Sequence, residues 1–268
     1  MHPHTSYLIL ATPRSGSYLL CEALIRTRLA GNPTEYFGPV QTNAIMKHLD
    51  TSNYAECLAW ILAQGTTPDG VFGGKVIWNF YAEFVDRVRK VVGDEKLSML
   101  EVLSTVFPNL HYICITRRDK VRQAISYWKA LRTDTWIDIT DRQSSETMLS
   151  NQQESPCPVP QENNPLQSPV RQEATFDYGA IEGLRYYLEH SEAEMQQYFV
   201  TCGIQPFKVV YEDFVDASEE TVKQMLDFLH IPRPERLALG KERTLHKQAN
   251  DQSEAWLQRY YQLKQQDT

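Results

Sequence analysis

A short run of cationic, hydroxyl and small residues, Arg14, Ser15, Gly16 and Ser17, lies near the start of the chain. It follows an apolar stretch at residues 7–11, which is typical of a buried strand, and a helical pattern comes after it. A helix N-terminus carries unpaired N–H groups and the positive end of the helix dipole, and small residues let an anion approach them. Arg14 adds a fixed charge with a planar fork of donors. The run therefore predicts a phosphate or sulfate site.

The same run differs from the ATP-binding P-loop. That motif is GxxxxGK[ST], and it needs both the lysine and the Mg²⁺-binding hydroxyl. Here Ser17 follows Gly16 directly, and no lysine comes after it. An ordinary tight turn, with Ser15 or Ser17 capping the helix, is the alternative interpretation without a ligand.

A second basic segment, Arg117 and Arg118, also lies where an apolar stretch meets a helical pattern. Ser126 follows Arg118 by eight positions, so the two side chains fall about 80° apart around a helix and could hold one phosphate. Cations are unfavourable at a helix start, which favours a bound anion there. Arg117 is an equally good partner for Ser126. Ligands gather at the carboxyl ends of strands in open α/β sheets, which is where both segments are predicted to lie.

The rest of the chain alternates apolar stretches with helical patterns. We expect strands at residues 7–11, 71–78, 111–116 and 207–211, with helices between them. This order predicts an α/β fold: a P-loop-like three-layer fold with a mostly parallel central sheet flanked by helices. We expect one domain over residues 1–268. Residues 138–174 are polar and Pro-rich, and we expect them to form a mobile insertion.

Composition excludes several classes of protein. A net charge of −7 over 268 residues argues against a nucleic-acid binder. The five cysteines are scattered without a CxxC pair, so we expect reduced thiols and no metal. No apolar run reaches about 18 residues, so we expect no stable membrane insertion. Residues 7–10 are too short for a signal peptide, which predicts a cytoplasmic protein.

The two basic segments, in this order, resemble the nucleotide-binding elements of sulfotransferases that use 3′-phosphoadenosine 5′-phosphosulfate (PAPS). The resemblance implies PAPS as donor and PAP as product. It implies that residues 13–20 bind the 5′-phosphosulfate, with Pro13 and Tyr18 beside the run described above. It also implies that Arg118 and Ser126 bind the 3′-phosphate.

Four further segments narrow the resemblance to the bacterial trehalose 2-sulfotransferase family: residues 31–37 (GNPTEYF), 70–79 (GVFGGKVIWN), 123–130 (QAISYWKA) and 251–256 (DQSEAW). The related enzymes are dimeric, so the resemblance implies a homodimer. This chain departs from the family at Pro13, where the trehalose enzyme has Gln, and after Phe37. The acceptor therefore stays open, as a sugar, a glycolipid or another small alcohol.

Transfer to an alcohol needs a general base, because the attacking hydroxyl loses its proton. From the residues alone Glu35 could be an ordinary surface carboxylate, but the family resemblance gives the matching glutamate the role of base. His48, further along the chain, is the rival. Arg14 would act beside the base by stabilising charge on the leaving phosphate.

Aromatic rings and scattered polar groups around Glu35 suit the faces and hydroxyls of a carbohydrate. The remaining candidates for the acceptor site are Pro13, Asn32, Pro33, Thr34, Tyr36, Phe37, Gly38, His48, Lys75, Trp78 and Asn79. Trp78 could equally be a core residue at a strand end. Lys247, before the last helical pattern, is a candidate to close over the nucleotide.

Two other functions fit the same anion-binding segments. A P-loop kinase or other NTPase would need the lysine that is missing after Gly16, and it would show Mg²⁺-dependent ATP binding. A non-catalytic module that keeps the nucleotide site would bind PAP without transferring sulfate to any alcohol.

Overall fold

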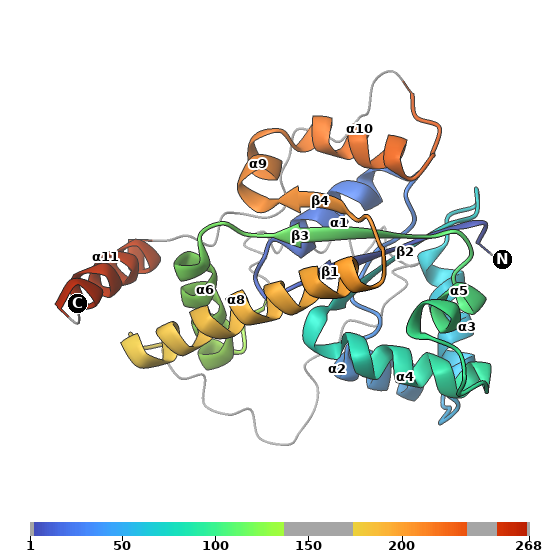
Figure 1. The fold of residues 1–268 in the computed structure, drawn as a ribbon, viewed down its shortest axis with the longest axis horizontal. Helices are drawn as coiled ribbons and strands as arrows, with labels where there is room; N and C mark the ends of the chain where they lie inside the picture. Colours follow the sequence, from blue (N-terminus) through green and yellow to red (C-terminus); the bar gives the residue numbers. More distant parts are fainter. Residues whose placement is uncertain (1–2, 137–173, 235–250, 267–268) are drawn as a thin grey trace.

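The structure is a computed structural model that describes residues 3–136, 174–234 and 251–266 (Figure 1). Its centre is a four-stranded sheet in the order β2-β1-β3-β4, with every neighbouring pair parallel. The strands are β1 (Thr5–Ala11), β2 (Val71–Ile77), β3 (Leu110–Thr116) and β4 (Phe207–Val210). The continuous apolar runs of these strands reflect burial on both faces, because helices cover a parallel sheet on each side.

Helices connect the strands. They are α1 (Ser17–Thr27), α2 (Pro39–His48), α3 (Tyr54–Gly65), the 3-10 helix η1 (Trp78–Phe80), α4 (Tyr81–Val92), α5 (Met99–Val106), α6 (Lys120–Thr133), α8 (Tyr178–Thr201), α9 (Tyr211–Asp216), α10 (Ser218–Phe228) and α11 (Asp251–Gln266).

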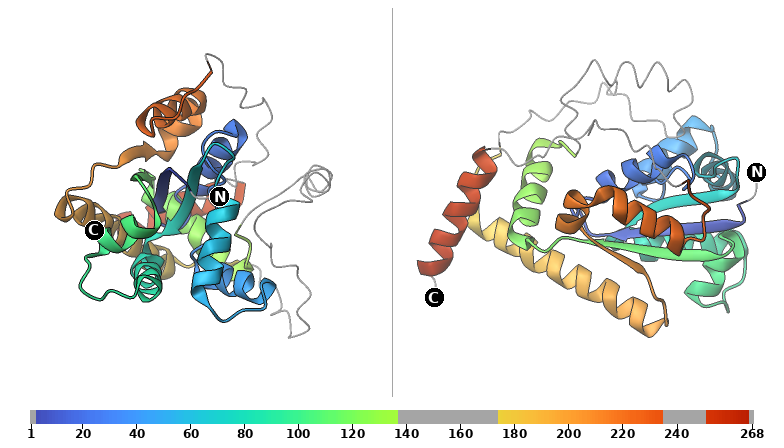
Figure 2. Two further views of the ribbon diagram at one scale, coloured as in Figure 1. Left: turned by 90° about the vertical axis from the view of Figure 1, so that its right-hand side faces the viewer. Right: turned by 90° about the horizontal axis from the view of Figure 1, so that it is seen from above.

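Each face of the sheet has its own hydrophobic core. Alternate residues of a strand point to opposite faces, so Leu8 and Leu10 join the core under α2 to α5 and the end of α8. Tyr7 and Ile9 join the core under α1, α9 and α10. Figures 1 and 2 show these two groups of helices on opposite sides of the sheet. The predicted three-layer α/β fold with a parallel central sheet is confirmed.

A third cluster of buried side chains lies at one end of the molecule. It joins α6, α8 and α11, and its members include Ile125 of α6, Leu188 of α8, and Trp256 and Tyr260 of α11. Figure 2 shows α11 beside α6 at this end. Helix α6 carries Ser126, so packing in this cluster holds that residue in place after β3.

The structure differs from the sequence expectations at three places. Strand β2 ends at Ile77, and Trp78 begins a 3-10 helix. Tyr211 begins α9 and is not the last residue of β4. Helix α2 was not expected; it starts at Pro39 because proline is favoured in the first turn, where its missing N–H is not needed. Lys247 and residues 138–173 of the expected insertion lie outside the described residues.

Candidate active site

The carboxyl ends of the parallel strands bring the predicted anion-binding segments to one edge of the sheet. Residues 12–16 follow β1, and Arg117 follows β3. Tyr211 follows β4, which pairs with β3. Segments far apart in the sequence therefore meet at this edge, as the position of ligand sites in open α/β sheets requires.

The loop after β1 has an unusual backbone. Arg14 and Gly16 have φ values of 62° and 91°, both in the left-handed region. No side chain caps the first turn of α1 among the described residues, so its N–H groups are available to a ligand. The Ser15 hydroxyl is buried and has no hydrogen-bond partner in the described part of the chain. An anion in the loop would satisfy these donors, so the loop fits the predicted phosphate or sulfate.

Arg14 joins the two predicted anion-binding segments. Its Nε donates a hydrogen bond of 2.9 Å to Oγ of Ser126, and its Nη1 donates to the carbonyl of Trp136. Nη1 of Arg117 donates in turn to the carbonyl of Arg14 over 3.4 Å. Burial, together with the charge of Arg117, lowers the pKa of Arg14 to about 10. Two partly buried cations beside each other favour an anion between them, because it would offset both desolvation and repulsion.

The neighbouring arginines have different surroundings. Burial lowers the pKa of Arg117, whose Nε is enclosed without a hydrogen-bond partner among the described residues. The Arg118 side chain is 59% exposed and forms an ion pair with Asp213 of α9. The structure thus brings Ser126 to Arg14, while Arg118 faces α9 at the rim of the same edge.

Gln123 supports the loop from α6. It is fully buried, and its Nε2 donates to Oγ1 of Thr12 over 2.9 Å and to the carbonyl of Pro13 over 2.7 Å. Gln123 begins one of the segments that resemble the family, but it was not among the expected site residues. Gln123 is a polar residue inside the apolar pattern of its helix. A buried amide needs hydrogen-bond partners, so this position could have indicated a contact with another segment.

Glu35 and Lys75 meet beside this edge. Nζ of Lys75 lies 2.8 Å from Oε2 of Glu35, and the Lys75 N–H donates to the carbonyl of Thr34 over 2.9 Å. Burial opposes the charged form of Lys75, but attraction to Glu35 outweighs it and raises the pKa of the ammonium group. Strand β2 thus holds the loop that carries the candidate base, through both its backbone and a side chain.

Several acceptor candidates have structural roles near Glu35. Tyr36 and Phe37 are buried, and the ring centroids of Phe37 and Phe84 lie 4.2 Å apart. Trp78 stacks on Tyr81 with ring centroids 5.4 Å apart. These aromatic side chains anchor the segments around Glu35 to the core.

The other candidates lie on several elements. The Asn32 side chain donates to the carbonyl of Gln64 over 3.0 Å, and Pro33 is buried. Gly38 touches Glu35, because a Cβ there would lie 3.1 Å from Oε1 of Glu35. Asn79 is exposed on η1. His48 is exposed at the end of α2, where its ring packs edge-on against Trp60.

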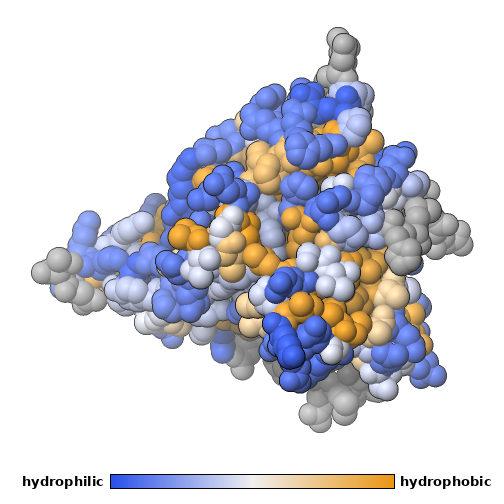
Figure 3. Space-filling view, turned by 45° about the vertical axis from the view of Figure 1, so that its right-hand side comes forward, coloured by the Kyte–Doolittle hydropathy of each residue, from blue (hydrophilic) through white to orange (hydrophobic). Residues whose placement is uncertain are grey.

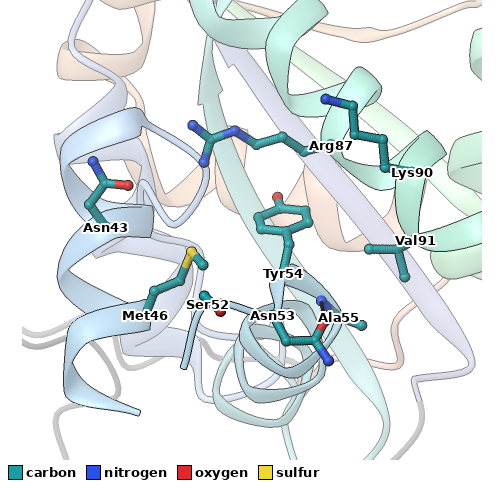
Figure 4. Close-up of a pocket in the computed structure, with 9 residues that line it drawn as sticks. All are labelled: Asn43, Met46, Ser52, Asn53, Tyr54, Ala55, Arg87, Lys90 and Val91. Carbon is teal, nitrogen blue, oxygen red and sulfur yellow. Dashed lines mark hydrogen bonds between the residues drawn. The ribbon is translucent and has the colours of Figure 1, made fainter. Parts of the chain in front are cut away.

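A separate pocket of about 640 Å³ lies among α2, α3 and α4 (Figure 4). Tyr54 and Arg87 face each other across it in the close-up, with the guanidinium carbon 5.8 Å from the ring centroid. Its lining comprises Asn43, Met46, Ser52, Asn53, Tyr54, Ala55, Arg87, Lys90 and Val91. None of the sequence-predicted site residues lines it, so we do not assign the chemistry to this pocket.

The chain is similar to known sulfotransferases along most of its length. The sequence profile of the Stf0 sulphotransferase family matches residues 6–263. The chain therefore belongs to the Stf0 sulphotransferase family. It is 29% identical to a trehalose 2-sulfotransferase of Mycolicibacterium smegmatis, over 99% of this chain and 97% of that protein. It is 28% identical to a trehalose 2-sulfotransferase of Mycobacterium tuberculosis, over 95% of this chain and 93% of that protein. The predicted resemblance is confirmed.

A sulfotransferase domain from the curacin biosynthetic pathway aligns with 94% of this chain and 82% of its own length, at 15% identity and a TM-score of 0.38.

Within the described residues, no group of three or more His, Cys, Asp or Glu side chains is arranged to hold a metal ion. The described helices include none that is long and apolar enough to cross a membrane. Figure 3 shows one face of the molecule, on which hydrophobic residues are interspersed among hydrophilic ones.

Proposed function

We propose that the protein transfers a sulfuryl group from PAPS to a hydroxyl of a carbohydrate-like or other small alcohol acceptor. The observation that carries this proposal is the position of Arg14, partly buried between Ser126 and Arg117 at the N-terminus of α1. Such a cluster of positive charge and unpaired donors suits a phosphosulfate. Membership of a sulfotransferase family makes PAPS the donor to test first.

The donor would occupy both anion-binding segments. The 5′-phosphosulfate fits the loop, held by Pro13, Arg14, Ser15, Gly16, Ser17 and Tyr18 and by the first N–H groups of α1. For the 3′-phosphate we propose Arg118 and Ser126, of which Ser126 also accepts a hydrogen bond from Arg14. Arg118 and Asp213 are both largely exposed, and an exposed ion pair contributes little to stability, so a phosphate can compete with Asp213 for Arg118. A phosphate dianion could replace Asp213, and Arg117 adds positive charge behind it.

The protein's contribution would be orientation, charge stabilisation and removal of one proton. Arg14 and the α1 N–H groups are suited to stabilise charge on the leaving phosphate. Glu35 would accept the proton of the attacking hydroxyl at a carboxylate oxygen, and Lys75 holds that carboxylate in place. A sulfuryl group carries less charge than a phosphoryl group, so we propose that no metal ion takes part.

For the acceptor we propose a carbohydrate-like alcohol bound beside Glu35, Thr34 and Asn79. The two curated relatives are named for trehalose, which makes trehalose the first acceptor to assay. Pro13 and the residues after Phe37 depart from the family pattern, so close relatives of trehalose and glycolipids belong in the same panel. A homodimer is also part of this proposal and can be checked by analytical ultracentrifugation.

The test is a transfer assay with sulfur-labelled PAPS, an excess of EDTA and a panel of sugars, glycolipids and small alcohols. We expect label in at least one sugar-type product, at a rate that EDTA does not change. PAP binding with no transfer to the panel or to a cell extract would favour the non-catalytic alternative. Mg²⁺-dependent ATP binding in place of PAP binding would favour the kinase alternative.

A further inference from the structure

We infer that α9 is a clamp that sets the spacing of the two donor-binding segments, and that Tyr211 is its central positioning residue. This inference rests on the proposed function, because it assigns a role around the same donor. The helix begins directly after β4 and lies against the connection that follows β3. It has no counterpart in the sequence prediction, which ended a strand at Tyr211.

The first contact is between the Tyr211 ring and the anion loop. A Cβ placed on residue 16 would lie 2.2 Å from Cδ2 of Tyr211, so the ring packs directly against the backbone of Gly16. Only glycine fits this approach, and it also accepts the φ value of 91° without strain. The ring thus fixes the loop at Gly16, the residue directly before α1.

The second contact is between the same ring and Arg117. The guanidinium carbon of Arg117 lies 4.7 Å from the Tyr211 ring centroid, within the range of a cation–π contact. The guanidinium also donates to the carbonyl of Arg14 over 3.4 Å. One aromatic ring therefore lies between the loop after β1 and the arginine after β3, in contact with both.

Two acidic residues extend the clamp. Oε2 of Glu212 accepts from the Arg118 N–H over 3.1 Å, and Oε1 accepts from the Asp119 N–H over 3.2 Å. Burial raises the pKa of Glu212, but these N–H groups and the charge of Arg117 outweigh it and keep the pKa below its usual value. Asp213 pairs with the Arg118 side chain at the rim. Three successive residues of α9 thus hold the backbone and side chains of the second donor-binding segment.

This arrangement has a specific consequence for binding. A nucleotide with two phosphate groups must engage both segments at once, so its affinity depends on their spacing. Loosening α9 should weaken donor and PAP binding while leaving the acceptor and the chemical step largely unaffected once the donor is saturating. A substitution at a residue with only a structural role would lower the stability without raising the KM for the donor separately from kcat.

The experiment compares Tyr211→Leu with Tyr211→Phe, which keeps the ring and both contacts. Calorimetric titration with PAP should give an affinity for Tyr211→Phe within about two-fold of wild type, and about ten-fold weaker binding for Tyr211→Leu. The KM for PAPS should rise in parallel, with kcat and the acceptor KM within about two-fold of wild type. Should Tyr211→Leu fail to fold, Glu212→Gln carries the same test, because an amide oxygen and nitrogen cannot accept from both N–H groups.

A double-mutant cycle with Gly16→Ala isolates the ring contact. The added methyl group should weaken PAP binding more in the wild-type background than in Tyr211→Leu, since its clash is with the ring. Equal penalties in both backgrounds, or unchanged PAP affinity in folded Tyr211→Leu and Glu212→Gln, would overturn the clamp and leave the proposed function intact. Wild-type protein that does not bind PAP would overturn the proposed function itself.

Discussion

Lys75 and Glu35 form an ion pair of 2.8 Å in which the lysine side chain is 9% exposed and the glutamate side chain 24% exposed. The lysine belongs to the sheet, while the glutamate belongs to a loop whose other anchors are the buried rings of Tyr36 and Phe37. The carboxylate is therefore fixed from the protein side and accessible from the outside. This is the arrangement that a positioned base requires.

Replacing Glu35 with Gln should strongly slow transfer and preserve donor binding. The amide cannot accept the hydroxyl proton, so we expect kcat to fall by ~10²–10⁴-fold. The affinity for PAP should stay within about two-fold of wild type, because the donor contacts lie on other residues. Single-turnover assays and calorimetry provide the two readings, and Glu56→Gln on α3 is the matched control. Wild-type turnover in Glu35→Gln would remove Glu35 from the mechanism.

Replacing Lys75 with Met should slow transfer while leaving donor binding intact. The ammonium group holds the Glu35 carboxylate over 2.8 Å, so without it the candidate base loses its fixed position. We expect kcat to fall about ten-fold, with the affinity for PAP within about two-fold of wild type. Lys208→Met, at an exposed position of β4, should leave both constants unchanged. Wild-type kcat in Lys75→Met would show that the ion pair does not position the base.

Replacing Arg118 with Ala should reduce the discrimination between PAP and 5′-AMP. Only PAP carries the 3′-phosphate, so we expect its affinity to fall at least about ten-fold while 5′-AMP binding changes little. Arg233→Ala is a suitable control, because Arg233 forms another exposed ion pair with an aspartate, Asp227. If both nucleotides weakened equally in Arg118→Ala, the 3′-phosphate would lie elsewhere, with Arg117 the next residue to test.

Replacing Gln123 with Leu should destabilise the protein. The substitution leaves the Thr12 hydroxyl and the Pro13 carbonyl without the amide that donates to them, which costs about 2 kcal/mol of unfolding free energy. Urea denaturation measures this loss. Gln197→Leu, at an exposed position of α8, should change the stability by less than about 0.5 kcal/mol. A stable Gln123→Leu protein would mean that water replaces the amide.

The contribution of Glu182 to stability should depend on pH. Hydrogen bonds from Arg185, assisted by one from Tyr260, lower the pKa of Glu182 to about 2. A depressed pKa in the folded state stabilises the protein above the unfolded pKa of about 4.5, and this stabilisation is lost as the pH falls toward 2. Wild type should therefore be more stable than Glu182→Gln at pH 7, and the difference should shrink as the pH falls through about 2. A difference that is independent of pH would contradict this assignment.

The elements that could be predicted are those with local signals. The apolar runs that became β1 and β3 are continuous because both faces of each strand are buried. The anion loop was recognisable because Arg14, Ser15 and Gly16 stand between a strand pattern and a helix pattern. Each of these predictions used neighbouring residues alone.

The contacts that could not be predicted join distant segments. The Arg14–Ser126 hydrogen bond depends on β1 and β3 being neighbours in the sheet, and spacing along the chain does not reveal that. The start of α9 at Tyr211 was hidden, since the apolar run of β4 continues into that residue without a break. Helical spacing left both Arg117 and Arg118 as partners for Ser126, and it gave no sign of the ion pair between Arg118 and Asp213, a residue with no motif around it.

The packing of Tyr211 against Gly16 also bears on the order in which the protein is made. The residues of the anion loop leave the ribosome early, whereas Tyr211 is added only after most of the chain has been synthesised. The contact between Gly16 and Tyr211 forms only once β4 and α9 have docked beside β3. If this contact sets the affinity for PAP, incomplete chains that end before β4 would bind PAP more weakly than the full chain.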